Sequence, residues 1–438
     1  MDLRDTLANL DRAAAGARMH ALVARLFPIC RSITGAGVRD TLAILGERLP
    51  LAIHEVPSGT SVFDWTVPPE WNVRDAWLRP VGGQKVADFR RSNLHLVSYS
   101  VPVRATLPLA ELRPHLHSLP EHPDWIPYRT SYYKEDWGFC LPHRVLDALP
   151  DGDYEVEIDS TLADGHLTYG ELELPGESGE EFLFSCHICH PSLANDNLAS
   201  IAVASELAAA LAALGERRYG YRFLFIPGTI GSITWLARNQ ARLARIRGGL
   251  VLANLGDAGG FTYKRSRHGG RQIDHAVDCA LRDHGEPCRE IPFSPWGYDE
   301  RQYGSPGIDL AVGRLTRTPH GEYPQYHTSA DDLDFVKPAA LGGSLAALLR
   351  VVTILEGNRR YLNLSPQCEP QLGRRGLYRS LGGGAEGRER ELAMLWVLNL
   401  SDGDHDLLQI AERSRVSFLR LREAADELLG AGLLRERA

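Results

Sequence analysis

Residues 185–199 read Ser185-Cys-His-Ile-Cys-His-Pro-Ser-Leu-Ala-Asn-Asp-Asn-Leu-Ala199. An apolar run at 181–186 precedes this segment and an alanine-rich run with helical spacing at 197–214 follows it, so the segment is expected to join a buried strand to a helix. It places two imidazoles, His187 and His190, and one carboxylate, Asp196, in a single loop, and zinc prefers these donors. A second interpretation stays open, in which Asn195-Asp-Asn197 caps the helix and the histidines are incidental.

The same alternation continues along the chain. Apolar strands are expected over 221–226, 249–255 and 308–312, and helices over 232–246 and 271–283. Strands and helices that alternate at this spacing predict an α/β fold, in which helices cover both faces of one sheet. Ligand sites in such folds lie beyond the carboxyl ends of the strands, which is where the loop after residue 186 falls.

We expect residues 1–60 and 165–365 to form one domain that contains this sheet. Two other regions are expected to form separate units. Residues 61–164 are rich in Trp, Tyr, His and Pro and contain short alternating runs, which predicts a β-rich inserted subdomain. We expect the Trp and Tyr residues of 65–137 to form the core of that subdomain rather than a stacking platform. A loop-like linker over 363–384 ends in three glycines, and residues 385–438 show three helical patterns followed by a candidate wing.

The shape of this C-terminal segment is that of a small winged helix, and its charge bears on its role. From residue 388 onward it contains eight Arg and ten Asp or Glu. Modules that read DNA usually carry a basic face. We therefore expect a packing or dimerisation role, with nucleic-acid binding and a transcriptional regulator less favoured.

The composition is that of an ordinary globular protein, with 24% charged and 44% hydrophobic residues and a net charge of −8. This charge speaks against a nucleic-acid backbone or an anionic membrane as the main partner. The seven cysteines are scattered, the N-terminus shows no signal peptide, and the most apolar stretch is too short to span a membrane. We therefore expect a soluble cytoplasmic protein.

Two further polar segments supply candidate ligands. His327 lies in Tyr326-His-Thr-Ser-Ala-Asp331, and Asp257 closes Asn254-Leu-Gly-Asp257 at the end of an expected strand. Either residue could complete a metal site. The alternatives are also open: His327 as the neighbour of a helix cap, and Asp257 as the first residue of a turn.

The chain resembles the zinc aminopeptidase-like superfamily, and more closely a bacterial branch with a β-rich insertion and a C-terminal winged helix. The resemblance covers nearly the whole chain. It is carried by Arg31-Ser-Ile-Thr-Gly35, Cys186-His-Ile-Cys-His-Pro191, Asn195-Asp-Asn197, Gly256-Asp257, Tyr263-Lys-Arg-Ser-Arg267, Trp296-Gly-Tyr-Asp-Glu-Arg-Gln302, Tyr326-His-Thr-Ser-Ala-Asp331 and Arg375-Gly-Leu-Tyr378.

The resemblance implies an aminopeptidase-like (phosphorylase/hydrolase-like) fold and a zinc site. Its ligands map to His187, Asp196, Asp257 and His327, and Cys189 stands where the superfamily has an acid that orients the first histidine. His190 is not a ligand position in the superfamily, but it is close enough to be an alternative.

One departure from the family pattern concerns catalysis. The family has an acid after the strand at 221–226, whereas this chain reads Pro227-Gly-Thr-Ile-Gly-Ser232, with Gly228 in the acid's place. A general base contributes roughly 10²–10⁴-fold to a rate. Glu300, and beside it Asp299, are the candidates to replace the acid. The loss also favours one zinc ion over two.

Basic residues near the expected site suggest what it binds. Tyr263, Lys264, Arg265 and Arg267 form an unusual run in an acidic protein, and Arg301 follows the candidate acids. Guanidinium groups bind carboxylates and phosphates bidentately, although a solvated loop or a surface ion-pair cluster explains such residues equally simply.

Together, these features predict a zinc-dependent enzyme acting on an amide or amino-acyl bond of a small anionic molecule or short peptide, in a biosynthetic pathway. The alternatives are a non-hydrolytic zinc enzyme (acyl transfer or cyclisation) and a catalytically impaired binding protein. A homo-oligomer is compatible with either, and the sequence does not identify the substrate.

Overall fold

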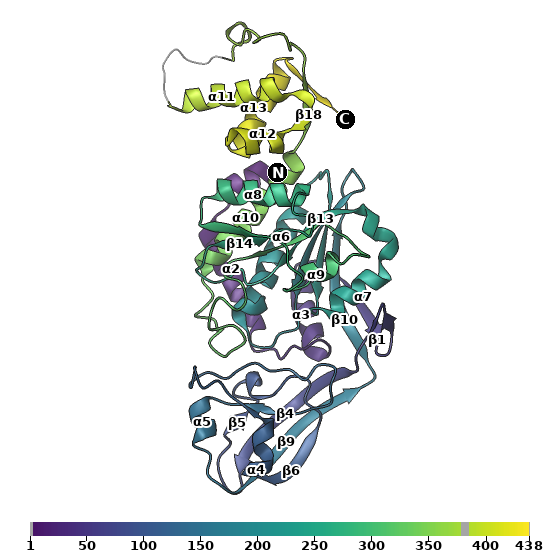
Figure 1. The fold of residues 1–438 in the computed structure, drawn as a ribbon, viewed down its shortest axis with the longest axis vertical. Helices are drawn as coiled ribbons and strands as arrows, with labels where there is room; N and C mark the ends of the chain where they lie inside the picture. The colour runs from purple at the N-terminus through teal and green to yellow at the C-terminus, as the bar shows by residue number, and fades with distance from the viewer. Residues whose placement is uncertain (1–2, 378–384, 438) are drawn as a thin grey trace.

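The computed structural model describes residues 3–377 and 385–437. Three bodies follow one another along the long axis of the molecule (Figure 1). A helix-covered sheet forms the middle, a β-rich body inserted between β1 (Ala52–Pro57) and β10 (His166–Leu174) lies at one end, and a small helical body with the C-terminus lies at the other. The predicted α/β fold with a β-rich insertion is confirmed.

Eight strands form the central sheet, in the order β1-β10-β12-β11-β13-β16-β14-β15. Its parallel centre consists of β12 (Gly220–Ile226), β11 (Glu181–His187), β13 (Ile246–Leu252) and β16 (Val312–Thr316). All residues of β11 and β12 are buried, and strands covered on both faces have such mainly apolar sequences. The other outer strands are β14 (Phe261–Lys264) and β15 (Cys288–Ile291).

The order of the strands places the loop after β11 at a switch point. β12 lies on one side of β11 and β13 lies on the other. In open α/β sheets, ligands bind at the carboxyl ends of the strands where such a reversal occurs. His187 is the last residue of β11 and therefore lies at this position.

Helices cover both faces of the sheet. Residues of α2 (Arg12–Leu26), α3 (Ala36–Gly46), α6 (Ser200–Ala212), α8 (Gln272–His284) and α10 (Pro338–Gly357) pack into one hydrophobic core, and α7 (Ile230–Arg238) packs into a second one. Among the described residues, α10 is the one helix long and apolar enough to cross a membrane. Because 83% of its apolar window is buried inside the protein, α10 has the burial of a core helix.

Two expected elements differ from those observed. The strand expected at 308–312 begins later, as β16, because the Ser305 carbonyl accepts hydrogen bonds from the N–H groups of Ile308 and Asp309 and forms a turn there. The helix expected at 232–246 divides into α7 and a 3₁₀ segment, Gln240–Arg245.

The inserted body contains a four-stranded antiparallel sheet in the order β5-β4-β9-β6. These strands are β4 (Glu70–Pro80), β5 (Ala87–Asp88), β6 (Val103–Pro108) and β9 (Asp153–Ala163). Trp71, Tyr99 and Tyr128 are buried, as expected for aromatic core residues. Trp65 and Tyr133 are instead exposed, so the expectation of a core role is wrong for these two residues.

Arg39 joins the inserted body to the middle body. From α3 it donates two hydrogen bonds of 2.8 Å to Glu70 at the start of β4, and this lowers the pKa of Glu70 to about 2. A carboxyl with a depressed pKa stabilises the fold above its ordinary value, and the gain is lost as pH falls toward the folded-state value. Arg39→Met is expected to lower the free energy of unfolding by about 1–2 kcal/mol at pH 7, an effect that shrinks below pH 5.

Urea unfolding of both proteins between pH 3 and 7 measures this effect. Arg74→Met is the matched control, because its ion pair with Asp159 is exposed and pairs of this kind contribute little. An equal loss of stability by Arg39→Met at pH 3 and pH 7 would contradict the assigned coupling.

The C-terminal body combines α11 (Ala385–Leu400), β18 (Asp402–Asp406), α12 (Leu407–Ser414), α13 (Phe418–Gly430) and β19 (Leu434–Arg437). The central strand of its small sheet is β17 (Arg360–Asn363), which precedes the range 385–438 expected from the sequence. The third helix, α13, packs on the middle body: the Phe418 N–H donates to Asp283, and Arg422 donates to the Gly357 carbonyl. These contacts hold α13 against the middle body of the same chain.

Candidate metal centre

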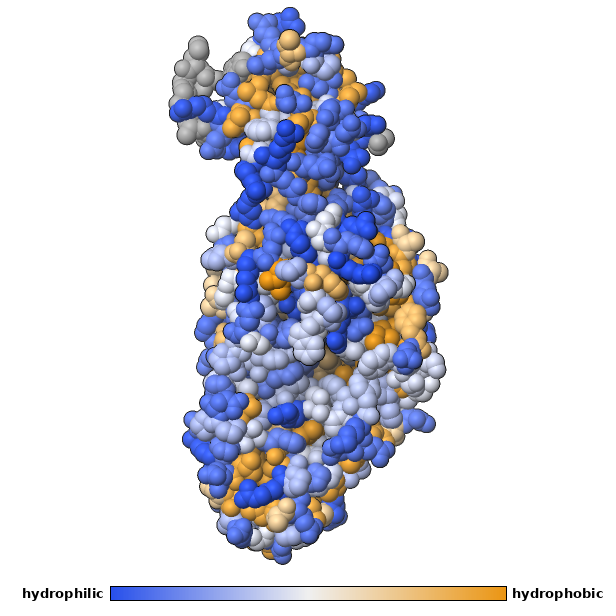
Figure 2. Space-filling model, viewed as in Figure 1, coloured by the Kyte–Doolittle hydropathy of each residue, from blue (hydrophilic) through white to orange (hydrophobic). Residues whose placement is uncertain are grey.

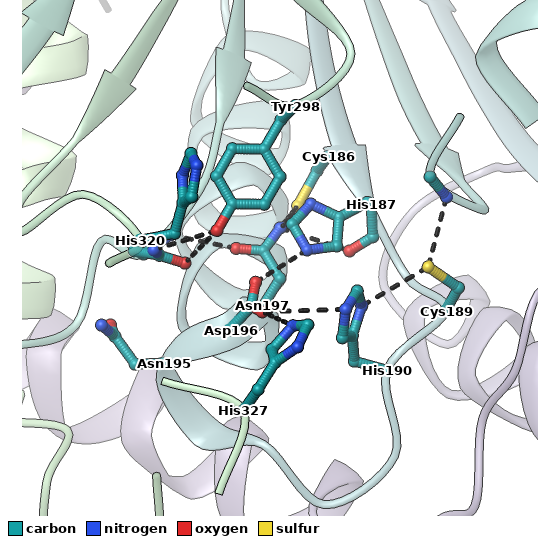
Figure 3. Close-up of polar contacts among 12 residues, drawn as sticks. Cys186, His187, Cys189, His190, Asn195, Asp196, Asn197, Tyr298, His320 and His327 are labelled. Atoms are coloured by element: carbon teal, nitrogen blue, oxygen red, sulfur yellow. Dashed lines mark hydrogen bonds and ion pairs between the residues drawn. The ribbon is translucent and has the colours of Figure 1, made fainter. Parts of the chain in front are cut away.

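Four side chains converge at the carboxyl end of β11 (Figure 3). Asp196 lies at the centre, with one carboxylate oxygen 2.9 Å from His187 Nε2 and the other 3.0 Å from His327 Nε2. His190 Nε2 lies 3.7 Å from the second oxygen. Ligand atoms of His187, His190 and Asp196 all lie within 4.8 Å of one another, so these three residues form a group able to hold a metal ion.

The loop after β11 is held in a conformation that aims Asp196 at the histidines. The N–H groups of Asn195 and Asp196 donate to the buried Asp331 carboxylate at 2.6 and 2.9 Å. Asn197 Nδ2 donates to the Leu252 carbonyl of β13 at 3.1 Å. The regular helix α6 begins only at Ser200, and no side chain caps it, so Asp196 does not have the role of a helix cap.

The inserted body holds His327 in place. The Tyr128 N–H donates to the His327 carbonyl at 2.7 Å, and the ring of Tyr128 packs edge-on against the His327 ring. His327 and Thr229 have φ values of 56° and 61°, in the left-handed region that side chains other than glycine seldom adopt. Backbone strain of this kind often collects at functional sites.

The electrostatics of the cluster suit metal binding. Burial disfavours the charge on Asp196, but the histidines around it outweigh this effect and hold its pKa well below the usual range. Burial lowers the pKa of His190 to about 3, so its imidazole is neutral at pH 7. Metal ligands must be deprotonated carboxylates and neutral imidazoles, and Asp196 and His190 are in these states.

Cys189 contacts a different histidine from the one the resemblance implies. Its Sγ lies 3.4 Å from His190 Nδ1 and accepts a hydrogen bond from the Gly228 N–H at 3.2 Å. Burial raises the pKa of Cys189 to about 12, so the thiol is protonated at neutral pH. The structure therefore places Cys189 where it orients His190 rather than His187.

The structure does not bring Asp257 and Glu300 to the cluster. Asp257 accepts hydrogen bonds from Asn195, from the Gly259 N–H and from the hydroxyl and N–H of Thr318. Glu300 is fully buried and pairs with Lys264 at 2.9 Å and with Arg314 at 3.5 Å. Neither carboxylate has a described contact with the histidines.

The basic run divides among separate partners. Tyr263 donates to Asp274, Arg265 pairs with Asp278 and Glu290, and Arg267 pairs with Asp309. These contacts agree with the alternative that such basic residues form surface ion pairs rather than a binding site for an anion. Of the five residues considered for substrate binding, Arg301 alone is among those that line the cavity beside the histidines.

That cavity has a volume of about 330 Å³. It is lined by Ile33, Tyr132, Tyr133, His187, Cys189, His190, Gly228, Thr229, Trp296, Gly297, Tyr298, Asp299, Arg301, His320 and Tyr326. Within the described part of the chain, the buried Arg301 Nε has no hydrogen-bond partner. An unpaired guanidinium beside a cavity is suited to an anionic group.

Asp299 and Gly228 lie together in this lining. Asp299 accepts a hydrogen bond from the Thr229 N–H at 2.7 Å, and burial raises the pKa of its carboxyl. A Cβ atom added to Gly228 would lie 3.5 Å from Cys189 Sγ and 3.6 Å from His187 Cβ, which is ordinary van der Waals contact. The glycine therefore leaves open a position beside the first histidine, and Asp299 lies next to it.

Sequence reasoning missed two residues of the site. Tyr298 stacks on His187 with ring centroids 5.1 Å apart, and His320 packs edge-on against Tyr298 (Figure 3). Tyr298 lies within the motif Trp296-Gly-Tyr298 that carried the family resemblance, so a signal for it was present. His320 lies outside those motifs.

A family model described as a domain of unknown function, DUF4910, matches residues 20–358. The chain belongs to this family. A second model, of a winged helix-turn-helix, matches residues 359–436. A protein of Clostridium acetobutylicum, provisionally named for polysaccharide biosynthesis and an aminopeptidase-like domain, is 52% identical over 420 residues, which is 96% of each chain.

Solved structures relate this DUF4910 chain to aminopeptidases. A crystal structure of a provisionally named peptidase from Clostridium acetobutylicum covers 100% of both chains with 49% identity and a TM-score of 0.94. A zinc aminopeptidase of Bacillus subtilis shares 12% identity with a TM-score of 0.57, covering 77% of this chain and 94% of the other. The second likeness shows the fold, and the predicted resemblance to the aminopeptidase-like superfamily, with a C-terminal winged helix, is confirmed.

Proposed function

We propose that this protein is a zinc-dependent hydrolase of an amide or amino-acyl bond in a small anionic substrate. The observation that carries the proposal is the convergence of His187, His190, Asp196 and His327 beside a cavity that also contains Arg301. A substrate held by Arg301 would present its bond next to the four ligand side chains.

The donor set fits zinc. Three imidazole nitrogens and a carboxylate oxygen are ligands that zinc takes readily, and a single ion is enough for this set. Because the oxygens of Asp257 are occupied by other partners, we assign the fourth place to His190 instead. Zinc bound there would supply Lewis-acid polarisation of the scissile carbonyl, for which it would have to accept the substrate as a further ligand.

The chain's own residues perform the remaining tasks. Arg301 binds the anionic end of the substrate and so orients the bond. Asp299, which is among the residues that line the cavity, accepts a proton from the attacking water and returns it to the leaving amine. Tyr298 covers one face of His187 and limits the access of bulk water to the reacting groups.

Other observations support the setting of this reaction. The provisional name of the Clostridium relative, which refers to polysaccharide biosynthesis, supports a role in biosynthesis. All seven cysteines are free thiols, which suits a reducing compartment such as the cytoplasm. Gly228 is the observation that favours a second function, that of a binding protein with impaired catalysis.

A panel of dipeptides, N-acyl amino acids and N-acyl amino sugars, with and without a carboxylate, tests the proposal on zinc-loaded and chelator-treated protein. We expect zinc-dependent turnover that prefers the carboxylate series. Arg301→Met is expected to raise KM for that series about tenfold, since this loses about 1.4 kcal/mol of binding, while kcat changes little.

Arg267→Met is the matched control, because Arg267 pairs with Asp309 and is not among the residues that line the cavity. If a zinc-loaded protein hydrolyses no member of the panel, the hydrolase proposal fails and the binding protein is favoured.

A further inference from the structure

Exposed aromatic side chains gather beside the candidate metal centre. The aromatic residues among the exposed large hydrophobic side chains in the described ranges are Phe63 (53% exposed), Trp65 (39%), Tyr133 (51%) and Trp296 (75%). Tyr133 and Trp296 both line the metal-site cavity. The Trp65 ring meets the Tyr133 ring edge-on at a centroid distance of 5.4 Å.

Phe63 is close to this cluster in the sequence. It lies in the turn between β2 (Ser61–Val62) and β3 (Trp65–Thr66), two residues before Trp65. The cluster therefore combines the hairpin and the Tyr133 loop of the inserted body with the Trp296 loop of the middle body. Figure 2 shows mainly pale residues of intermediate hydropathy where these two bodies meet.

The backbone at Tyr133 is also strained. Tyr133 has a φ of 66°, a value that bulky side chains rarely adopt, whereas the φ of 55° at Phe63 belongs to the two-residue turn between β2 and β3, where a positive φ is usual. The Tyr133 ring is half exposed and gains little from the hydrophobic effect, so packing alone does not account for its strain. Strained residues at the mouth of a cavity are a common feature of sites that bind a ligand.

We propose that Trp65, Tyr133 and Trp296 form a stacking platform for the sugar ring of the substrate, which is an N-acylated amino sugar or an oligosaccharide of such sugars. The inference rests on the proposed function and names its substrate class. The amide of an N-acyl amino sugar is the type of bond that the metal site would attack, and a sugar stacked at the mouth would place that amide toward the cavity.

The openness of the platform favours a sugar over an apolar side chain. Apolar ligand groups are usually enclosed, with most of their surface buried. The three rings are instead 39% to 75% exposed. A pyranose suits such a surface, because its C–H face packs on an aromatic ring while its hydroxyl groups stay in water.

Isothermal titration calorimetry with the tetramer of N-acetylglucosamine tests the platform, with tetraglycine as the comparison probe. We expect the wild-type protein to bind the sugar tetramer and not tetraglycine at millimolar concentrations. Trp296→Ala and Tyr133→Ala are each expected to weaken this binding about tenfold. Leu392→Ala, which removes an equally exposed apolar side chain from α11, is expected to leave it unchanged.

Two results would overturn the platform: wild-type protein that binds the sugar tetramer no better than tetraglycine, or aromatic variants that bind it as tightly as wild type. Thermal unfolding checks that the variants are folded. Asp196→Asn separates the two proposals, because loss of the metal site is expected to leave sugar binding in place. If sugar binding persists and hydrolysis is never found, the platform stands and the hydrolase proposal fails.

Discussion

Asp196→Asn is expected to lower the zinc content of the purified protein from about one ion per chain to near zero. Asp196 is the carboxylate that contacts both His187 and His327. Its replacement by asparagine removes the one anionic ligand of the proposed site. Changes to groups that merely orient ligands cost 10- to 100-fold in metal affinity, so loss of a ligand should cost at least about 100-fold. Elemental analysis after dialysis against zinc measures the outcome.

Asp257→Asn is the matched control, since the same substitution is made at a carboxylate that the structure places with Thr318 and Gly259. This variant is expected to retain its zinc. Its thermal unfolding must be compared with that of the wild-type protein, because Asp257 is buried. If the folded Asp196→Asn protein retains zinc and the folded Asp257→Asn protein loses it, Asp257 and not Asp196 is the zinc ligand.

The sequence predicts the location of this centre because strand ends are easy to recognise. A buried apolar strand that ends at His187 fixes that residue at the edge of the sheet. The chain must then return to α6 within a short loop, so Asp196 stays near the same edge. The polar motif around His327 predicts that it belongs to a site, but its contact with Tyr128 of the inserted body has no local signal.

Side-chain direction is what the sequence could not supply. Tyr263 and Lys264 are consecutive residues of β14, and consecutive side chains in a strand point to opposite faces. Tyr263 accordingly donates to Asp274, while Lys264 donates to Glu300. A basic run that looks like one patch in the sequence therefore serves separate partners.

Long-range partners limit the prediction in the same way. Asp257 meets Thr318, which is 61 positions away, and Asp299 meets Thr229, which is 70 positions away. The sequence around Asp257 does not indicate that its carboxylate oxygens accept hydrogen bonds from Gly259 and Thr318. The sequence around Asp299 does not indicate that this residue lies beside Gly228. The same limit applies to Trp65 and Tyr133, which are exposed although the aromatic composition of 65–137 predicts core residues.

Asp299→Asn is expected to lower kcat about 10²–10⁴-fold on the best substrate of the hydrolysis panel while zinc content stays unchanged. Asp299 is among the residues that line the cavity, and the amide oxygen of asparagine can still accept the Thr229 N–H hydrogen bond. Burial raises the pKa of Asp299, and a base must be deprotonated, so the wild-type rate should fall as pH drops through that raised value. An Asp299→Asn enzyme that keeps the wild-type rate and acidic limb would exclude Asp299 as the base.

Gly228→Glu in the Asp299→Asn protein is expected to recover at least about tenfold of the lost kcat, because a carboxylate again reaches the cavity. The room for it is present: a Cβ at this position meets its neighbours at 3.5 and 3.6 Å, and the nearest of them is the Cys189 sulfur. Gly228→Gln is the control, since it fills the same space without a proton acceptor of comparable basicity. Recovery by glutamate and not by glutamine would show that Asp299 performs, from a different loop, the task that the family gives to an acid at position 228. Equal rates for the two double variants would mean that position 228 cannot deliver a base to the reacting bond, and that Gly228 marks a different reaction geometry.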